Sequence, residues 1–155
     1  MSADDVKIDD RGWRDVKKLL AVVRASPYVD TGVFEGSGEY ADGTPVAEIA
    51  AIHEYGTRDG RIEPRSFVRA GLEKADAELT RLQENLVHDY LAKRLSWGDL
   101  QKRLGEAGVK AIQDRITSGG VTPKLAPSTI ARKGHDIPLY DTGTLVNAVS
   151  WRPGK

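Results

Sequence analysis

The sequence predicts one domain, over residues 1–155, that is built mainly from α-helices and contains a few β-strands. The chain of 155 residues has the usual length of a single domain, and 39% of its residues are hydrophobic, which is enough for a core. Apolar residues recur at the helical spacing of three and four positions in several stretches. Residues with high β-propensity gather in one short segment near residue 30 and in another near the C-terminus.

The N-terminal part predicts a helix followed by a strand. The apolar residues that would share one face of this helix are Trp13, Val16, Leu19, Leu20 and Val23. We expect the helix to start near Asp9 or Asp10 and to stop at Ser26-Pro27, because a residue before proline disfavours the helical conformation. The segment Tyr28–Phe34 is rich in β-branched and aromatic residues and leads into Gly36-Ser37-Gly38, so it predicts a strand that runs into a turn.

A short second helix is expected after the turn at Asp42-Gly43. Thr44 can cap free amides and Pro45 tolerates the first helical position, so the pair predicts a helix that continues through residues 46–52. Gly56 is well placed to end it, because helices often close on a left-handed residue.

A long third helix is expected from Ser66, after an exposed loop over Thr57–Arg65. Its apolar residues form a continuous stripe: Val68, Leu72, Ala75, Leu79, Leu82 and Leu86. The stripe could pack on the sheet of this chain or on a neighbouring subunit. We favour the first alternative, because most amphipathic helices cover their own core.

Ser96 and Asp99 resemble a capping box, which predicts a fourth helix. Its apolar residues are Leu100, Leu104, Val109, Ile112 and Ile116, and Ser118-Gly119-Gly120 should end it. Gly105 and Gly108 weaken this helix, and a close approach of another helix would compensate for them.

The C-terminal third predicts three short elements. A flexible stretch passes through Pro123 to Pro127, and residues 127–133 then suggest a short helix that a turn at 133–136 follows. Residues 144–148 suggest a helical turn and residues 149–152 a final strand.

The composition argues against several classes of protein. The 23 Lys and Arg residues balance 23 Asp and Glu residues, so no net charge would draw the chain to nucleic acid or to a membrane surface. There is no cysteine, which excludes disulfides and thiolate nucleophiles. The first residues lack the features of a signal peptide and no apolar run is long enough to span a bilayer. We expect a soluble protein of a cytoplasm.

A repeated tripeptide raises one enzymatic alternative. Asp30-Thr31-Gly32 and Asp141-Thr142-Gly143 share the spelling of the two catalytic segments of aspartic peptidases, in which paired carboxylates share a proton. The first copy lies in an expected strand, whereas the second precedes an expected helix, and their flanking sequences differ. Asp-Thr and Asp-Gly are also common in turns, which is the interpretation we prefer.

Metal and phosphate sites find no support. His53-Glu54 resembles the start of a zinc protease helix, but Thr57 stands where the second histidine is required. Gly36-Ser37-Gly38 lacks the third glycine of a dinucleotide-binding loop, and the next helix begins too late. We expect no metal, no cofactor and no catalytic residue.

Basic residues cluster around the expected loop and the start of the long helix, at Arg58, Arg61, Arg65 and Arg69. They could form a charged contact surface for an acidic neighbour. The alternative is a solvated loop with local pairing to Asp59 and Glu63, because most surface ion pairs contribute little.

Four segments follow one another between Tyr28 and Trp151. They are Val46–Thr57 with its closing His53-Glu54-Tyr55-Gly56-Thr57, Ile62–Ala70, Pro127–Gly134, and Pro138–Leu145 with Asp141-Thr142-Gly143-Thr144-Leu145. In this order they resemble a family of small tailed-phage and prophage proteins, described as virion morphogenesis, neck, head-tail joining or tail completion proteins. The chain departs from the family at Glu63 and Ser66, where proline is usual, although Ser66 can still cap the helix.

The resemblance implies an α+β fold, with a small, mostly antiparallel sheet packed against a long helix and additional short helices. It also implies a non-enzymatic virion assembly protein that acts at the head-tail junction or tail end. The expected partners are further copies in a ring-like homo-oligomer and other connector or tail proteins, without a small-molecule substrate, a membrane or direct nucleic-acid readout. The expected interaction residues are Arg58, Arg61, Arg65, Phe67 and Arg69. A peptidase that uses Asp30 and Asp141, and a cytoplasmic adaptor unrelated to virions, remain the alternatives.

Overall fold

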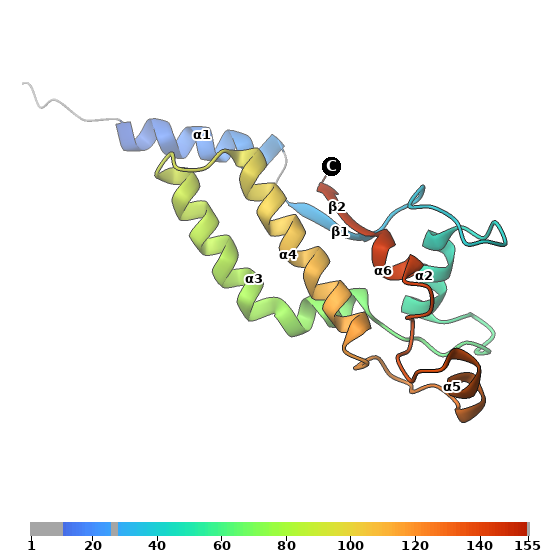
Figure 1. Ribbon diagram of the computed structural model, residues 1–155. Coiled ribbons are helices and arrows are strands. Elements are labelled where there is room, and N and C mark those ends of the chain that lie inside the picture. Colours follow the sequence, from blue (N-terminus) through green and yellow to red (C-terminus); the bar gives the residue numbers. More distant parts are fainter. Residues whose placement is uncertain (1–10, 26–27, 155) are drawn as a thin grey trace, which may run out of the picture.

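The fold is α+β, as the sequence predicts, in a computed structural model that describes residues 11–25 and 28–154 (Figure 1). In chain order the elements are α1 (Arg11–Ala25), β1 (Val29–Val33), α2 (Val46–Tyr55), α3 (Val68–Leu91), α4 (Trp97–Thr117), α5 (Pro127–Lys133), α6 (Thr144–Ala148) and β2 (Val149–Pro153). The predicted start of the first helix near Asp9 or Asp10, and its predicted stop at Ser26-Pro27, lie outside the described residues.

The sheet joins the strand that follows α1 to the last strand of the described chain. β1 and β2 pair antiparallel, with Thr31 opposite Trp151 and Val33 opposite Val149. Both strands were predicted from their composition, but their pairing depends on segments that lie more than a hundred residues apart. Within the described ranges the sheet has these two strands, so β1 keeps one edge without a partner strand.

The sheet packs against α4, and two glycines of this helix make the close approach possible. A Cβ atom at Gly108 would lie 2.9 Å from Oγ1 of Thr31, and one at Gly105 would overlap the indole ring of Trp151. The sequence suggested another helix as the element that these glycines could admit, and the structure shows that they admit the sheet. Thr31 and Trp151 face each other across the two strands, so both side chains lie on the face of the sheet that covers α4.

Helices α3 and α4 form a long antiparallel hairpin (Figure 1). They approach closely at Gly71, where a Cβ atom would lie 3.1 Å from the carbonyl oxygen of Ala111. Leu86 of the predicted stripe is buried, but Leu72 and Leu79 are only half-buried. The stripe thus packs mainly on α4, and the sheet leaves part of α3 uncovered.

The core lies at the end of the hairpin where α3 begins and α4 ends, beside α2 and α6. Its largest fully buried side chains are Phe67, Ile112, Ile116, Val46, Val121 and Pro138. The helix α1 lies at the opposite end of the hairpin, where Asp15 pairs with Lys93 at 3.7 Å (Figure 1). No helix in the described ranges is long and apolar enough to cross a membrane.

Two predicted helix caps are not formed, and one is. Helix α2 begins at Val46 after Pro45 without a side-chain cap, so Thr44 does not cap it. Helix α3 begins at Val68, and the side chain of Ser66 does not accept a hydrogen bond from its first turn. At α4, Oγ of Ser96 accepts from the backbone N–H of Asp99 at 3.1 Å, which confirms the predicted cap.

Candidate interaction site

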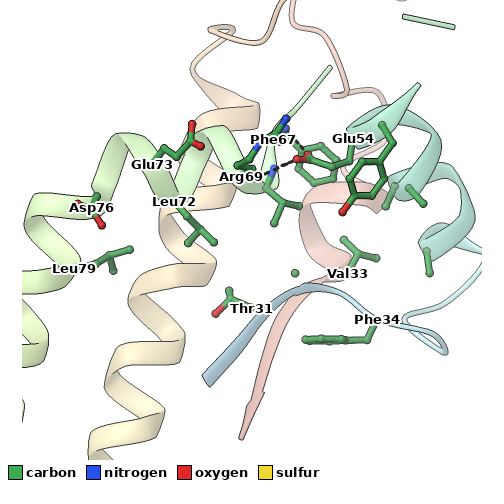
Figure 2. Close-up of a pocket in the computed structure, with 16 residues that line it drawn as sticks. Thr31, Val33, Phe34, Glu54, Phe67, Arg69, Leu72, Glu73, Asp76 and Leu79 are labelled. Carbon is green, nitrogen blue, oxygen red and sulfur yellow. Dashed lines mark hydrogen bonds between the residues drawn. The ribbon is translucent and has the colours of Figure 1, made fainter. Parts of the chain in front are cut away.

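The start of α3 is capped by a side chain from another helix. Glu54 lies in the last turn of α2, and only 7% of its surface is exposed. Its carboxylate accepts a hydrogen bond from Oγ of Ser66 at 2.8 Å. It also accepts hydrogen bonds from the backbone N–H groups of Phe67 at 2.8 Å, Val68 at 2.9 Å and Arg69 at 3.3 Å (Figure 2). These N–H groups have no partner inside the helix, so a carboxylate is the group that satisfies them best.

The hydrogen bonds keep Glu54 ionised. Burial acts to raise its pKa, but the hydrogen bonds from Ser66, Val68, Phe67 and Arg69 act in the opposite direction and outweigh it, so the pKa of Glu54 lies below its ordinary value. The carboxylate therefore fixes the end of α2 to the start of α3.

The loop between these helices is held at both ends. The backbone N–H of Arg65 donates to the carbonyl of His53 at 2.6 Å, and that of Thr57 donates to the carbonyl of Ile62 at 3.0 Å. Gly56 ends α2 with a φ of 75°, as predicted, and a Cβ atom there would lie 2.7 Å from the carbonyl oxygen of Ile62. Only glycine fits this turn without a shift of the loop, because a side chain would meet backbone.

The five predicted interaction residues separate into exposed and internal ones. Arg58 and Arg61 are exposed on the loop and Arg69 is exposed on α3. Arg61 also pairs with Asp59, at 3.1 Å, which is the local pairing that the alternative interpretation expects. Arg65 turns inward, where its Nε donates to the carbonyl of Pro123 at 3.0 Å, and Phe67 has no exposed surface. Arg65 and Phe67 therefore support the loop from within.

An apolar groove of about 810 Å³ lies between β1, α2 and α3 (Figure 2). Its lining is mostly apolar and includes Val33, Phe34, Ala47, Ala50, Ala51, Leu72 and Leu79. Its α3 wall also carries Arg69, Glu73 and Asp76. The sequence indicated one wall of this groove through the apolar stripe of the long helix. Only the structure shows that Leu72 and Leu79 of this stripe remain partly exposed.

A second depression, which we call the basic hollow, has a volume of about 370 Å³ and lies on another side of α2. Its charged and polar lining includes His53, Arg65, Arg132, Lys133, Asp141, Asp42 and Tyr40. Burial, followed by the charges of Arg65 and Lys133, lowers the pKa of His53, so its imidazole is neutral at pH 7. Its Nδ1 is buried and lacks a hydrogen-bond partner among the described residues.

Lys133 is held at the edge of the basic hollow by the chain itself. Its Nζ donates to the carbonyl oxygens of Tyr140 and of Ile137, the latter at 3.4 Å. Burial lowers the pKa of Lys133, partly offset by Asp141. Lys133 therefore joins the end of α5 to the segment before α6.

Residues from four separate segments of the sequence, Val46–Thr57, Ile62–Ala70, Pro127–Gly134 and Pro138–Leu145, line the basic hollow. Ile49 and His53 come from the first segment, Arg65 from the second, Thr129, Arg132 and Lys133 from the third, and Leu139, Asp141 and Leu145 from the fourth. These segments are spread over residues 46–145 of the sequence, so only folding brings them together.

The two Asp-Thr-Gly segments lie in unlike surroundings. Asp30 is in β1 and pairs with Arg152 of β2, with 3.4 Å between Oδ2 and Nε. Asp141 lines the basic hollow together with Tyr40. Burial is the main cause that raises the pKa of the Tyr40 phenol, and the negative charge of Asp141 raises it further. Asp30 is not part of this lining, so the structure does not bring both carboxylates into one cavity.

The described residues include no group of three or more His, Asp or Glu side chains placed to hold a metal ion. Comparisons of the chain with protein-family models, with curated proteins and with solved structures find no match.

Proposed function

We propose that this chain is a non-enzymatic virion assembly protein of a tailed phage or prophage, which acts at the head-tail junction or tail end. It would be made in the host cytoplasm and would then be built into the neck or tail. The observation that carries the proposal is the convergence of the four family-like segments around the basic hollow. Segments that resemble one family along the sequence also form one structural unit, which favours a common origin over chance similarity.

The geometry suits a protein that works by binding. Glu54 joins α2 to α3 through four hydrogen bonds, and the loop that it flanks is closed by backbone hydrogen bonds. A loop held in one conformation loses little entropy when it binds a neighbour. The proposed action is therefore the presentation of a preorganised loop, and no covalent bond is made or broken.

Within this loop, Arg58 and Arg61 are the basic side chains that are exposed to a partner. We propose that they face acidic groups on the next copy in a ring or on a connector or tail protein. Charges at the rim of an interface mainly set orientation and association rate, so these arginines would guide docking, and buried apolar contacts would supply most of the affinity.

The proposal can be tested in a lysogen that carries the gene. Deletion of the gene should, after induction, leave filled heads and free tails that do not join, visible by negative-stain electron microscopy, and infectious titre should fall by several orders of magnitude. Complementation with the wild-type chain should restore the titre. Normal infectious particles from the deletion strain would contradict the proposal.

Charge reversal tests the role of the loop in the same strain. Arg58→Glu with Arg61→Glu should fail to restore the titre, although circular dichroism of the purified variant should match wild type, because both side chains are exposed. A matched control, Arg81→Glu with Arg103→Glu, makes the same charge change on exposed positions of α3 and α4. Equal titres from the two double variants would show that the loop arginines have no special role.

A further inference from the structure

The helix α1 carries an exposed apolar face. Trp13, Val16 and Leu20 are 60%, 41% and 46% exposed, and their spacing places them on one side of the helix. Asp15 and Lys18 line the contact with the hairpin end instead, beside Tyr90 and Leu91. The apolar face therefore points away from the body of its own chain. An exposed cluster of large apolar side chains is typical of an interaction surface.

The polar side of α1 is basic. Its described side chains include Arg14, Lys17 and Lys18 against the single acidic residue Asp15. Lys17 stands over the indole ring of Trp13, with Nζ 5.7 Å from the ring centroid, so positive charge borders the apolar face.

The apolar groove has the complementary properties. It is lined by Val33, Ala47, Ala51 and Leu79 together with other apolar side chains. On its α3 wall the acidic residues Glu73 and Asp76 outnumber the basic residue Arg69 (Figure 2). A basic amphipathic helix is a ligand that such a groove accepts, because apolar anchors enter the groove while lysines meet the acidic wall. Its volume of about 810 Å³ leaves room for several large side chains.

We infer that the apolar face of α1 from one copy of the chain docks into the apolar groove of a second copy. Trp13 is the central anchor, with Val16 and Leu20 beside it, and Lys17, which borders this face, lies near Glu73 and Asp76 of the second copy. This inference deepens the proposed function and rests on it for the ring, since it names the contact by which successive copies join.

A second copy is the occupant because α1 lies far from the groove of its own chain. It sits at the end of the hairpin near Leu91, whereas the α3 lining of the groove ends at Leu79, and these positions are separated by roughly 18 Å of helix. Helix and groove are different surfaces of one chain, so the contact is head-to-tail. Repeated with the correct rotation, a head-to-tail contact closes into a ring.

Analytical ultracentrifugation of the full chain and two defective variants tests the inference. Trp13→Glu with Leu20→Glu removes the docking face, and Ala51→Arg fills the groove with a basic side chain at an exposed position of α2. Each variant should associate roughly 30-fold or more weakly than wild type, as expected for the loss of an interface anchor. Controls outside both surfaces are Ala131→Glu and Ala77→Arg, at exposed positions of α5 and α3, and both should associate like wild type.

Mixing provides the decisive measurement. A mixture of the two defective variants retains one intact helix and one intact groove, so it should form a complex of two chains and no larger species. Charge reversal on both sides of the contact tests its electrostatic part separately from its apolar packing. Lys17→Glu should weaken association, and the addition of Glu73→Lys with Asp76→Lys to the same chain should restore it.

Several results would overturn the inference. They are a wild-type chain that stays monomeric at its highest soluble concentration, a helix variant that associates like wild type, and a mixture that yields no complex. If only the groove variant loses association, another occupant is indicated, such as a strand added to the open edge of β1. None of these results bears on whether deletion of the gene blocks virion joining, so failure of this contact and failure of the proposed function remain distinguishable.

Discussion

The two long helices of the hairpin begin in different ways. The first turn of α4 is capped by its own sequence, since Oγ of Ser96 accepts from the N–H of Asp99 and also donates to the Asp99 carboxylate at 2.6 Å. The first turn of α3 is capped by Glu54, which lies more than ten residues earlier and on another helix. The Ser96 cap is exposed, whereas Glu54 is buried.

This difference separates two functions of a cap. A local cap stabilises one helix and leaves its position in the molecule free. The Glu54 cap also fixes the distance and angle between α2 and α3, and with them one wall of the apolar groove and the base of the arginine-bearing loop. Its loss should therefore disturb tertiary structure, while loss of Ser96 should cost only helix stability.

Removal of the Glu54 side chain is expected to have the largest effect. Glu54→Ala leaves three backbone N–H groups at the start of α3 without their acceptor, so the free energy of unfolding should fall by about 3 kcal/mol. Urea denaturation followed by circular dichroism measures the change. Glu48→Ala, at an exposed position of the same helix, is the control and should change the free energy by less than about 0.5 kcal/mol.

The second largest effect is expected from acid, which should weaken the Glu54 cap. Because the pKa of Glu54 in the folded protein lies below its ordinary value of 4.5, its stabilising effect is complete above pH 4.5 and is lost as pH falls through the lower folded pKa. The stability gap between wild type and Glu54→Gln should therefore be widest near pH 6 and narrow below pH 4.5. Urea midpoints at several pH values measure it, and a gap that does not change with pH would contradict an ionised cap. Glu48→Gln is the control.

The smallest effect is expected at the local cap. Ser96→Ala should lower the free energy of unfolding by about 1 kcal/mol, because one N–H of the α4 first turn returns to water at an exposed site. The variant should keep the self-association of wild type, since Ser96 lines neither the groove nor the contact of α1 with the hairpin end. If Ser96→Ala destabilised the chain as much as Glu54→Ala, the distinction between the two caps would fail.

Local signals explain which parts of the fold could be predicted. The Ser96 cap, the stop at Gly56 and the strand composition around Thr31 depend on residues that lie within a few positions of one another, and all three predictions are confirmed. The predicted cap by Ser66 is wrong because its hydroxyl instead donates to Glu54, a residue twelve positions away. A serine before a helix indicates a cap only when no stronger acceptor competes for the same N–H groups.

The candidate site follows the same division. The sequence indicated an exposed arginine-bearing loop, and the structure exposes Arg58 and Arg61 there. It could not show that Arg65 turns inward to the carbonyl of Pro123, or that Phe67 is buried in the core. Both depend on chain segments that meet only after folding.

By itself the sequence determined the order of helices and strands and where several of them end, because spacing, capping residues and glycine act over one or two turns. Tertiary structure alone decided how these elements meet. It placed the sheet on Gly105 and Gly108 of α4, and it left the apolar groove open beside α3. It also made Glu54 the cap of α3, since the buried carboxylate of Glu54 accepts hydrogen bonds from three N–H groups at the start of this helix.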